Sequence, residues 1–391
     1  MSANHRPEDI YPRNFNVTDI PVEKFTHIVY CFANISNVTG EVGLSDKWAD
    51  IERLDPDEDV PTSSNDIYGN LKQLFLLKKR NRYLKTLLSV GGYGQNSNDW
   101  SLILPNETLR YSFARTAVGL MYNLGFDGLD YDYEFINSAE QAIQFIDLLN
   151  KTRAQMETYS PCPFLLTIDA PCGASSYKFM NLRGMDTFVD QWNIMAYDFA
   201  GAFSTSPSGS YAGHAQNLYG SNDIHATPFN TSSAIEYYIS QGISPSKINL
   251  ANPVYGHVFR NTLGPGTLFN GTGAGDYNDT QGNCNYNLLP LAGSNPRIVE
   301  DHELGASYSY DNVSMVMVSY DTPNISKQKA QYVQSRDLGG VAWWEVSMDK
   351  RGNESLIGAA VDTLGALETS WNRLTYPNST YDNLRNKFPG E

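Results

Sequence analysis

The chain has 391 residues, 41% of them hydrophobic, so it can bury a substantial core as one large domain or two ordinary ones. Its formal net charge of −15 argues against nucleic acid and anionic membranes as partners, because both are themselves negatively charged. No apolar run reaches about 18 residues, so we expect no membrane-spanning helix.

Short apolar runs alternate along the chain with longer segments of helical periodicity. The runs predicted to be strands are 26–33, 85–91, 126–132, 164–170, 189–197, 248–255 and 340–344. The segments predicted to be helices are 71–80, 107–124, 139–156, 232–241 and 326–338. Continuous apolar strands joined by helices indicate a parallel sheet covered on both faces. About seven such units in one α/β chain favour a (β/α)8 TIM barrel, with functional groups at the carboxyl ends of its strands.

Two segments interrupt this alternation. Residues 256–319 are rich in Gly, Asn and Tyr, and their short apolar runs indicate a small α+β insertion after the seventh strand. We therefore predict a barrel in two parts, residues 1–255 and 320–391, with an insertion domain at residues 256–319. At the other break, residues 1–9 are polar and contain Pro7. The first barrel strand is thus expected to be missing or degenerate.

The most informative segment is residues 126–134, which read FDGLDYDYE. Side chains alternate faces along a strand, so Asp130, Asp132 and Glu134 share one face. Three ionised carboxyls on one face repel one another, so their pKa values must spread and at least one must rise. A carboxylic acid that stays protonated near neutral pH can donate a proton in catalysis.

A solvated acidic turn and a calcium loop are the alternatives for this segment. Turns seldom carry Leu, Tyr and Phe between the acids, and an EF-hand loop has Gly at its sixth position, where this segment has Phe135. The histidines are scattered, and no Cys/His set has the spacing of zinc ligands. We therefore expect no metal site.

The motif Asp127-x-x-Asp130-x-Asp132-x-Glu134 resembles the signature of glycoside hydrolase family 18, the chitinases. Further stretches resemble motifs of the same family and lie in order along the chain: Ser89-Val90-Gly91-Gly92, Met195-Ala196-Tyr197-Asp198, Pro253-Val254-Tyr255-Gly256 and Trp343-Trp344-Glu345. The tail Tyr376-Pro377-Asn378-Ser379-x-Tyr381-Asp382-Asn383 resembles that of fungal chitinases of the bacterial type. The resemblance extends from about Ile10 to the last residue.

The resemblance implies hydrolysis of a glycosidic bond with retention of configuration at the anomeric carbon, assisted by the acetamido group of the substrate itself. This mechanism is an exception to the usual scheme, in which two carboxyl groups of the enzyme perform the reaction. Glu134 would be the general acid, and Asp132 would orient the acetamide N–H of the sugar. Asp130 would share a proton with Asp132, or else be a buried structural acid. Asp127 points to the other face and is expected to be a structural hydrogen-bonding residue. The hydroxyl of Tyr197 suits the acetamide oxygen.

Other residues of these motifs are expected to contact sugar rings: Tyr93, Met195, Asp198, Tyr255, His257 and Trp344. Trp344 would form a floor on which a sugar stacks, although an inward Trp of a barrel can also be ordinary core. Tyr93 stands where the family has Trp, and His257 stands where it has Arg. Asp169 replaces a small residue and adds a carboxyl to an already acidic site.

We therefore predict a chitinase, a monomer without a cofactor, that acts on chitin and chito-oligosaccharides. One alternative is a lectin-like chitin-binding protein with weak or no catalysis, against which the presence of Glu134 argues. The other alternative is an endo-β-N-acetylglucosaminidase, which the expected insertion disfavours.

The location is predicted from glycosylation acceptors and from the N-terminus. Asn-x-Ser/Thr acceptors are frequent and favour an extracellular protein; they include Asn16, Asn37, Asn106, Asn150, Asn230, Asn270, Asn278, Asn312, Asn324 and Asn378. The first 25 residues contain no apolar segment of the kind found in signal peptides. An intracellular location is therefore the alternative.

Overall fold

The computed structural model describes residues 15–55, 59, 63–160, 162–206, 209–273, 275 and 282–391. Contacts divide the chain into two units. The first comprises Met1–Ala170, Phe179–Trp192 and Ala366–Glu391, and the second comprises Pro171–Lys178 and Asn193–Gly365. Segment 1–9, where we expect no regular first strand, lies outside the described residues. None of the described helices is long and apolar enough to cross a membrane.

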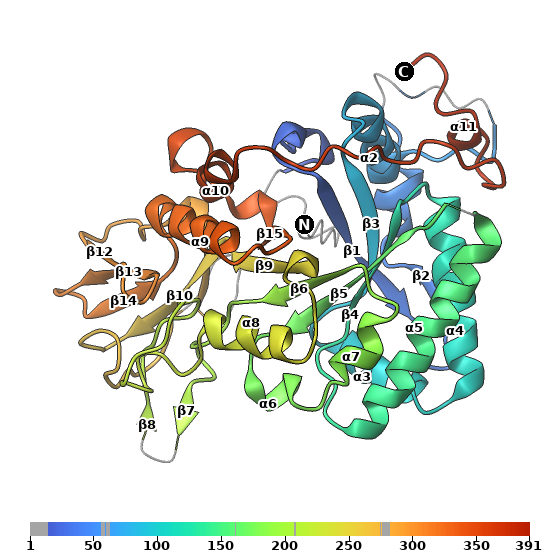
Figure 1. The fold of residues 1–391 in the computed structure, drawn as a ribbon. Helices are drawn as coiled ribbons and strands as arrows, with labels where there is room; N and C mark the ends of the chain where they lie inside the picture. The colour runs from blue at the N-terminus through green and yellow to red at the C-terminus, as the bar shows by residue number, and fades with distance from the viewer. Residues whose placement is uncertain are drawn as a thin grey trace. The chain divides into compact units, whose positions relative to one another are not determined.

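The first unit is built on parallel strands that alternate with helices (Figure 1). Its strands are β1 (His27–Ile35), β2 (Val42–Leu44), β3 (Lys85–Gly91), β4 (Gly128–Asp132) and β5 (Leu165–Pro171). They lie in the order β5–β4–β3–β1–β2, and only β2 runs antiparallel to its neighbour. All residues of β3 are buried, as expected for a strand that is covered on both faces.

The helices of the first unit are α2 (Gly69–Arg80), α3 (Gln95–Ile103), α4 (Glu107–Asn123), α5 (Ala139–Tyr159), α7 (Leu182–Asp186) and α11 (Asp382–Arg385). The short 3₁₀ helices η1 (Val17–Asp19) and η2 (Val22–Lys24) and the short π-helix η3 (Trp48–Glu52) also belong to this unit. Helix α4 begins where Asn106 accepts hydrogen bonds from two backbone N–H groups, and α5 begins at Ser138 in a similar way. The two helices lie side by side in Figure 1.

An aromatic cluster holds the outward face of β4. Trp100 is fully buried, and its ring stacks on Tyr133 at a centroid distance of 5.4 Å. It also meets the edges of Tyr131 at 5.7 Å and Phe145 at 5.8 Å. Because Tyr131 and Tyr133 alternate with the acidic residues, this cluster holds the acidic face of β4 toward the opposite side.

The second unit contains a parallel part and an antiparallel sheet. The parallel strands are β6 (Gln191–Met195), β9 (Ile248–Pro253) and β15 (Gly340–Trp344), in the order β15–β9–β6. The helices are α6 (Ala174–Tyr177), α8 (Thr231–Ser240), α9 (Pro323–Ser335) and α10 (Leu356–Leu364), with turns η4 (Pro245–Lys247), η6 (Tyr286–Leu288), η7 (Val346–Met348) and η8 (Gly352–Glu354). Helices α9 and α10 pack against each other.

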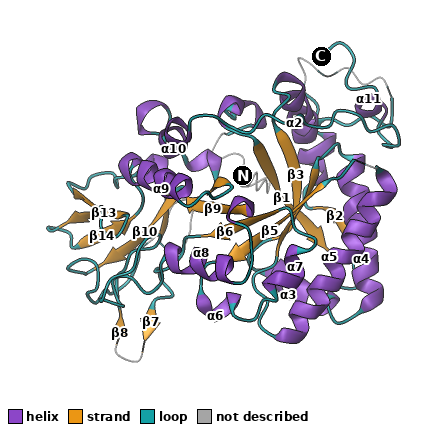
Figure 2. Cartoon of the chain, viewed as in Figure 1, coloured by secondary structure: helices purple, strands orange, loops and turns teal. Residues whose placement is uncertain are grey.

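The antiparallel sheet has five strands, in the order β11–β10–β14–β13–β12, and Figure 2 shows β10, β13 and β14 as neighbours. Their bounds are β10 (Tyr255–Arg260), β11 (Asn283–Asn285), β12 (Arg297–Asp301), β13 (Ala306–Asp311) and β14 (Val316–Ser319). A separate hairpin joins β7 (Thr205–Ser206) to β8 (Gly209–Ser210). Phe259 and Met317 are fully buried under the sheet together with Ala200 and Ala212. The predicted division at residues 255/256 and 319/320 stays a prediction.

One predicted strand is wrong at its end. We expected residues 248–255 to form one strand with Tyr255 as its last residue, but β9 ends at Pro253 and Tyr255 begins β10. The chain bends at Val254, whose N–H donates to the carbonyl of Trp344, and Tyr255 then pairs antiparallel with Asn285. The apolar pattern continues through the bend, so it gave no sign of the change in pairing.

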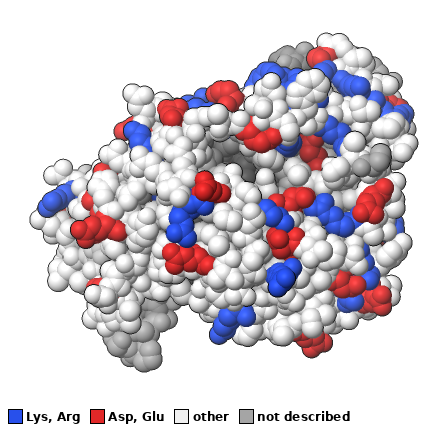
Figure 3. Space-filling view, viewed as in Figure 1, with Lys and Arg blue, Asp and Glu red and all other residues white. Residues whose placement is uncertain are grey.

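The charge of the protein is spread over its surface on the side that Figure 3 shows. Acidic and basic side chains are interspersed there among uncharged residues. The excess of acidic residues is therefore not gathered in one cluster on this side.

Candidate active site

Asp130 lies in the middle of β4, between two hydroxyl groups. The strand register places it opposite Ser89 of β3 and Thr167 of β5, and both hydroxyls donate to its carboxyl group. The Ser89 Oγ–Asp130 Oδ2 distance is 2.6 Å. Asp130 is fully buried, and this burial raises its pKa, while the two hydroxyl donors act in the opposite direction.

Asp132 ends β4 and lies opposite Asp169 of β5 in the strand register. Only 4% of its surface is exposed, and burial is the largest cause that raises its pKa well above the usual range. The negative charge of Glu134 adds to the rise, as do those of Asp169 and Asp130. Asp132 thus favours the protonated form, as predicted for one acid of this face. Its buried Oδ1 has no hydrogen-bond partner among the described residues.

Glu134 lies two residues beyond the end of β4, in a turn, and is half-buried. Its negative charge contributes to the raised pKa of Asp132, so the two carboxyl groups interact electrostatically. Tyr133 between them points to the opposite side and is buried against Trp100. The arrangement leaves Glu134 as the most accessible of the three acids, at the carboxyl end of the strand.

The stretch Ser89–Gly92 brings β3 unusually close to Asp132. Gly91 has a φ of +120°, and a Cβ at this position would collide with the Asp132 carbonyl oxygen and with Trp100 Nε1. The N–H of Gly92 donates to the same carbonyl at 2.9 Å. Glycine is therefore required at position 91 by both backbone conformation and space.

In the second unit, Asp198 gathers two of the predicted sugar-binding residues. Its Oδ1 accepts a hydrogen bond from the Tyr255 hydroxyl at 2.7 Å and lies 2.7 Å from His257 Nε2. Tyr255 and His257 alternate along β10 and so share one face. The ring of Tyr197 meets that of Tyr255 at a centroid distance of 6.2 Å and an angle of 69°. These four residues therefore form one group.

The remaining predicted residues lie at ends of strands. Met195 ends β6 and is buried, and Trp344 ends β15 and is half-buried. Trp344 lies opposite Pro253 of β9, and Pro253 precedes Tyr255 by two residues in the chain. Tyr93, after β3 in the first unit, is 83% exposed, so its ring is not packed into the protein's own core.

Asp127 is a structural hydrogen-bonding residue, as expected. It precedes β4, accepts from the N–H of Thr86 at 2.8 Å, and forms an ion pair with Lys78 at 2.8 Å. It also accepts from the backbone N–H of Arg373 at 2.6 Å. These contacts lie at the amino end of β4, away from Glu134.

The contributions of Ser89 and Thr167 to the site were not predicted. Ser89 lies on β3 and Thr167 lies on β5, the two strands that flank β4. Each comes to lie opposite Asp130 only through the register in which these strands pair, which the sequence does not show. For Thr167 the only signal in the sequence was a small hydroxyl residue in a mostly apolar run, whereas Ser89 also belongs to the motif Ser89–Gly92. Among the described residues, no group of three or more His, Cys, Asp or Glu side chains could hold a metal ion. The chemistry that this site offers is that of carboxyl and hydroxyl groups.

Comparison with known proteins identifies the family. The sequence model of the Glycosyl hydrolases family 18 matches residues 3–349. The chain belongs to this family. It is 39% identical over 385 residues to Endochitinase 1 of Metarhizium robertsii, covering 97% of this chain and 88% of that protein. It is 37% identical to Chitinase 1 of Aphanocladium album over 96% of this chain and 88% of that protein.

Solved structures of family 18 proteins have the same fold. The catalytic domain of psychrophilic chitinase B from Arthrobacter TAD20 has a TM-score of 0.80 at 25% identity and covers 91% of this chain and 92% of that one. Chitinase ChiA74 from Bacillus thuringiensis has a TM-score of 0.79 at 25% identity and covers 91% of this chain and 68% of that one. These likenesses confirm the predicted TIM barrel with an α+β insertion.

Proposed function

We propose that this family 18 protein is a chitinase, which hydrolyses β-1,4 linkages between N-acetylglucosamine units of chitin and chito-oligosaccharides. The observation that carries this proposal is the acidic face of β4, where Asp132 has a pKa raised well above the usual range beside Glu134. The similarity to proteins named endochitinase and chitinase supports the substrate.

In the first step Glu134 donates its proton to the glycosidic oxygen. At the same time the acetamido oxygen of the sugar that carries the reacting anomeric carbon attacks that carbon. The bond to the leaving sugar breaks, and a cyclic oxazolinium ion forms. Asp132, which lies beside Glu134 at the end of β4, accepts a hydrogen bond from the acetamide N–H. Asp130, held by Ser89 and Thr167, shares the proton of Asp132.

In the second step water attacks the anomeric carbon of the oxazolinium ion. The carboxylate of Glu134 takes a proton from that water, and the ring opens to restore the acetamido group. Two successive inversions at the anomeric carbon give net retention, so the first product is the β-anomer.

For the second unit we propose roles in binding the acetamido group and the sugar rings. The Tyr197 hydroxyl donates to the acetamido oxygen and thereby stabilises the charge that develops in the transition state. Asp198 contacts the sugar with Tyr255 and His257, which hydrogen bond to it. Trp344 stacks on a sugar ring, and Met195 and Tyr93 complete the sugar contacts.

The test compares chitotetraose with cellotetraose, which lacks the acetamido group. We expect hydrolysis of chitotetraose only, with the β-anomer as the first product seen by NMR, and inhibition by a thiazoline analogue of the intermediate. Cleavage of cellotetraose at a comparable rate would show that the acetamido group takes no part. An α-anomer as first product would exclude the two-step route.

We also propose that the protein works outside the cell. Every acceptor asparagine that the structure describes is exposed, apart from the half-buried Asn230. Such positions are compatible with glycans on the folded protein. A mass difference after treatment with a glycosidase that removes N-glycans, measured on protein from the native host, tests this proposal.

A further inference from the structure

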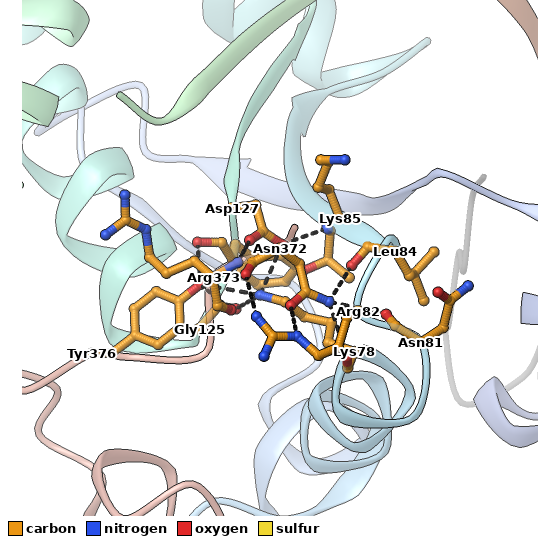
Figure 4. Close-up of polar contacts among 12 residues, drawn as sticks. Lys78, Asn81, Arg82, Leu84, Lys85, Gly125, Asp127, Asn372, Arg373 and Tyr376 are labelled. Carbon is orange, nitrogen blue, oxygen red and sulfur yellow. Dashed lines mark hydrogen bonds and ion pairs between the residues drawn. The ribbon is translucent and has the colours of Figure 1, made fainter. Parts of the chain in front are cut away.

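Two sequence motifs that the proposed chemistry does not use meet in the first unit. One is Asp127, which belongs to the acidic signature but points away from Glu134. The other is the C-terminal tail around Tyr376. Figure 4 shows the two motifs joined through Lys78 of α2. We name Lys78, Asp127, Asn372, Arg373 and Tyr376 the tail clamp.

The centre of the tail clamp is the ammonium group of Lys78, which is 1% exposed. It lies 2.8 Å from Asp127 Oδ2 and donates to the carbonyl of Gly125 at 2.7 Å. It also donates to the Tyr376 hydroxyl at 3.1 Å. That hydroxyl in turn donates to the carbonyl of Phe126 at 2.9 Å. Three successive residues before β4, Gly125 to Asp127, are thus held by α2 and the tail.

The tail itself is fixed by Asn372, which is 5% exposed. Its side-chain amide donates to the carbonyls of Lys78 at 2.9 Å and Leu84 at 2.7 Å and accepts from Arg82 Nε at 2.8 Å. The next residue, Arg373, donates its backbone N–H to Asp127. One tail segment therefore binds the end of α2, the approach to β3 and the start of β4 together.

A buried ion pair is weak evidence for stability, because apolar residues of similar volume can often replace it without loss. What directional polar contacts add is a fixed geometry. In the tail clamp each contact defines the position of the β4 start relative to α2 and the tail. Glu134 lies seven residues after Asp127, in the turn that follows β4, and is at most roughly 23 Å away at the rise of a strand.

We propose that Lys78 and Tyr376 are positioning residues for the proposed general acid. By fixing the start of β4, the tail clamp sets where Asp132 and Glu134 lie at its other end. This inference rests on the proposed function of Glu134. The ladders with β3 and β5 also hold β4, so loss of one clamp contact shifts the strand slightly and does not displace it.

The test is Tyr376→Phe, which removes only the hydroxyl and keeps the buried ring against Tyr122 and Phe75. The matched control is Ser379→Ala. Ser379 belongs to the same tail and is 2% exposed, but its hydroxyl donates to the carbonyl of Asn123 at the end of α4, at 2.7 Å. Each variant thus loses one buried hydroxyl, and only Tyr376→Phe loosens the start of β4.

With chitotetraose, well below both melting temperatures, we expect Tyr376→Phe to lower kcat about 3- to 10-fold and to change KM less than about 2-fold, since sub-ångström misplacement affects the reacting geometry first. Ser379→Ala should keep the wild-type kcat at a similar loss in melting temperature. Equal kcat values for the two variants would overturn the proposal, as would an effect on KM alone.

Amide hydrogen exchange gives a second readout that does not depend on activity. The backbone amides of residues 128–134 should exchange faster in Tyr376→Phe than in Ser379→Ala, and equal exchange would also overturn the proposal. If the Glu134→Gln variant still hydrolysed chitotetraose, the proposed function would fail, whereas the exchange result would still decide whether the tail clamp fixes β4.

Discussion

His214 provides a quantitative prediction about stability in acid. It lies in the second unit, is 2% exposed, and faces the edge of the Tyr308 ring at 5.8 Å. Its Nδ1 is buried and has no hydrogen-bond partner among the described residues. Burial lowers the pKa of His214 from 6.5 to about 4, against a smaller opposite effect of Asp301.

The magnitude follows from the difference between the two pKa values. The folded protein holds the imidazole neutral down to about pH 4, whereas the unfolded chain takes up a proton below 6.5. The unfolded state therefore binds more protons in this window, and the free energy of unfolding falls as pH falls through it. The difference of 6.5 − 4 = 2.5 units corresponds to roughly 3 kcal/mol, at about 1.4 kcal/mol per unit.

The perturbation is His214→Gln, which is neutral in both states at every pH. Urea unfolding of the two proteins is measured from neutral pH down to about pH 4, and the free energies of unfolding are compared at each pH. The two proteins can differ in free energy of unfolding at neutral pH. On acidification, the free energy of unfolding of the wild type should fall by about 3 kcal/mol relative to that of the variant. Parallel curves would refute the argument, because they would show that the imidazole is protonated equally in both states.

Three further predictions concern the site. Gly91→Ala should lower both melting temperature and activity, the latter by more than about 10-fold, because the new methyl group pushes β3 away from Asp132; activity at the wild-type level would show that the close approach is dispensable. Asp169→Asn removes a charge that raises the pKa of Asp132, so the limb of the pH–rate profile that reports Asp132 should move to lower pH, and an unmoved profile would contradict this. Tyr197→Phe should lower kcat about 10²-fold with little change in melting temperature, and an effect confined to KM would count against its role in the transition state.

The barrel strands were the most predictable part of the fold. Strands β3 and β15 have the predicted bounds, because each is a mostly apolar run between clear breaks. Helix α10, LIGAAVDTL, was not predicted, because it is short and almost entirely apolar, and a short apolar run can be either a strand or a buried helix. Helix α3, QNSNDWSLI, was missed for the opposite reason, because most of its residues are polar.

The site was predictable where its residues are close in sequence. Asp130 and Asp132 alternate along β4 and share one face, as expected, and Glu134 follows in the next turn; the raised pKa of Asp132, to which the charge of Glu134 contributes, agrees with the expectation that these acids interact. Contacts between distant segments could not be predicted. Lys78 and Tyr376 are 298 residues apart, and no local pattern indicates that their side chains meet.

The most direct test of the account is the Glu134→Gln variant, which keeps the shape of the side chain and removes the proton donor. The measurement is kcat for chitotetraose together with the dissociation constant of the same oligosaccharide. We predict that hydrolysis falls by about 10² to 10⁴-fold, the usual contribution of general acid catalysis, while binding is retained. A variant that kept more than a tenth of the wild-type turnover, or lost turnover only through lost binding, would contradict the assignment of Glu134 as the acid.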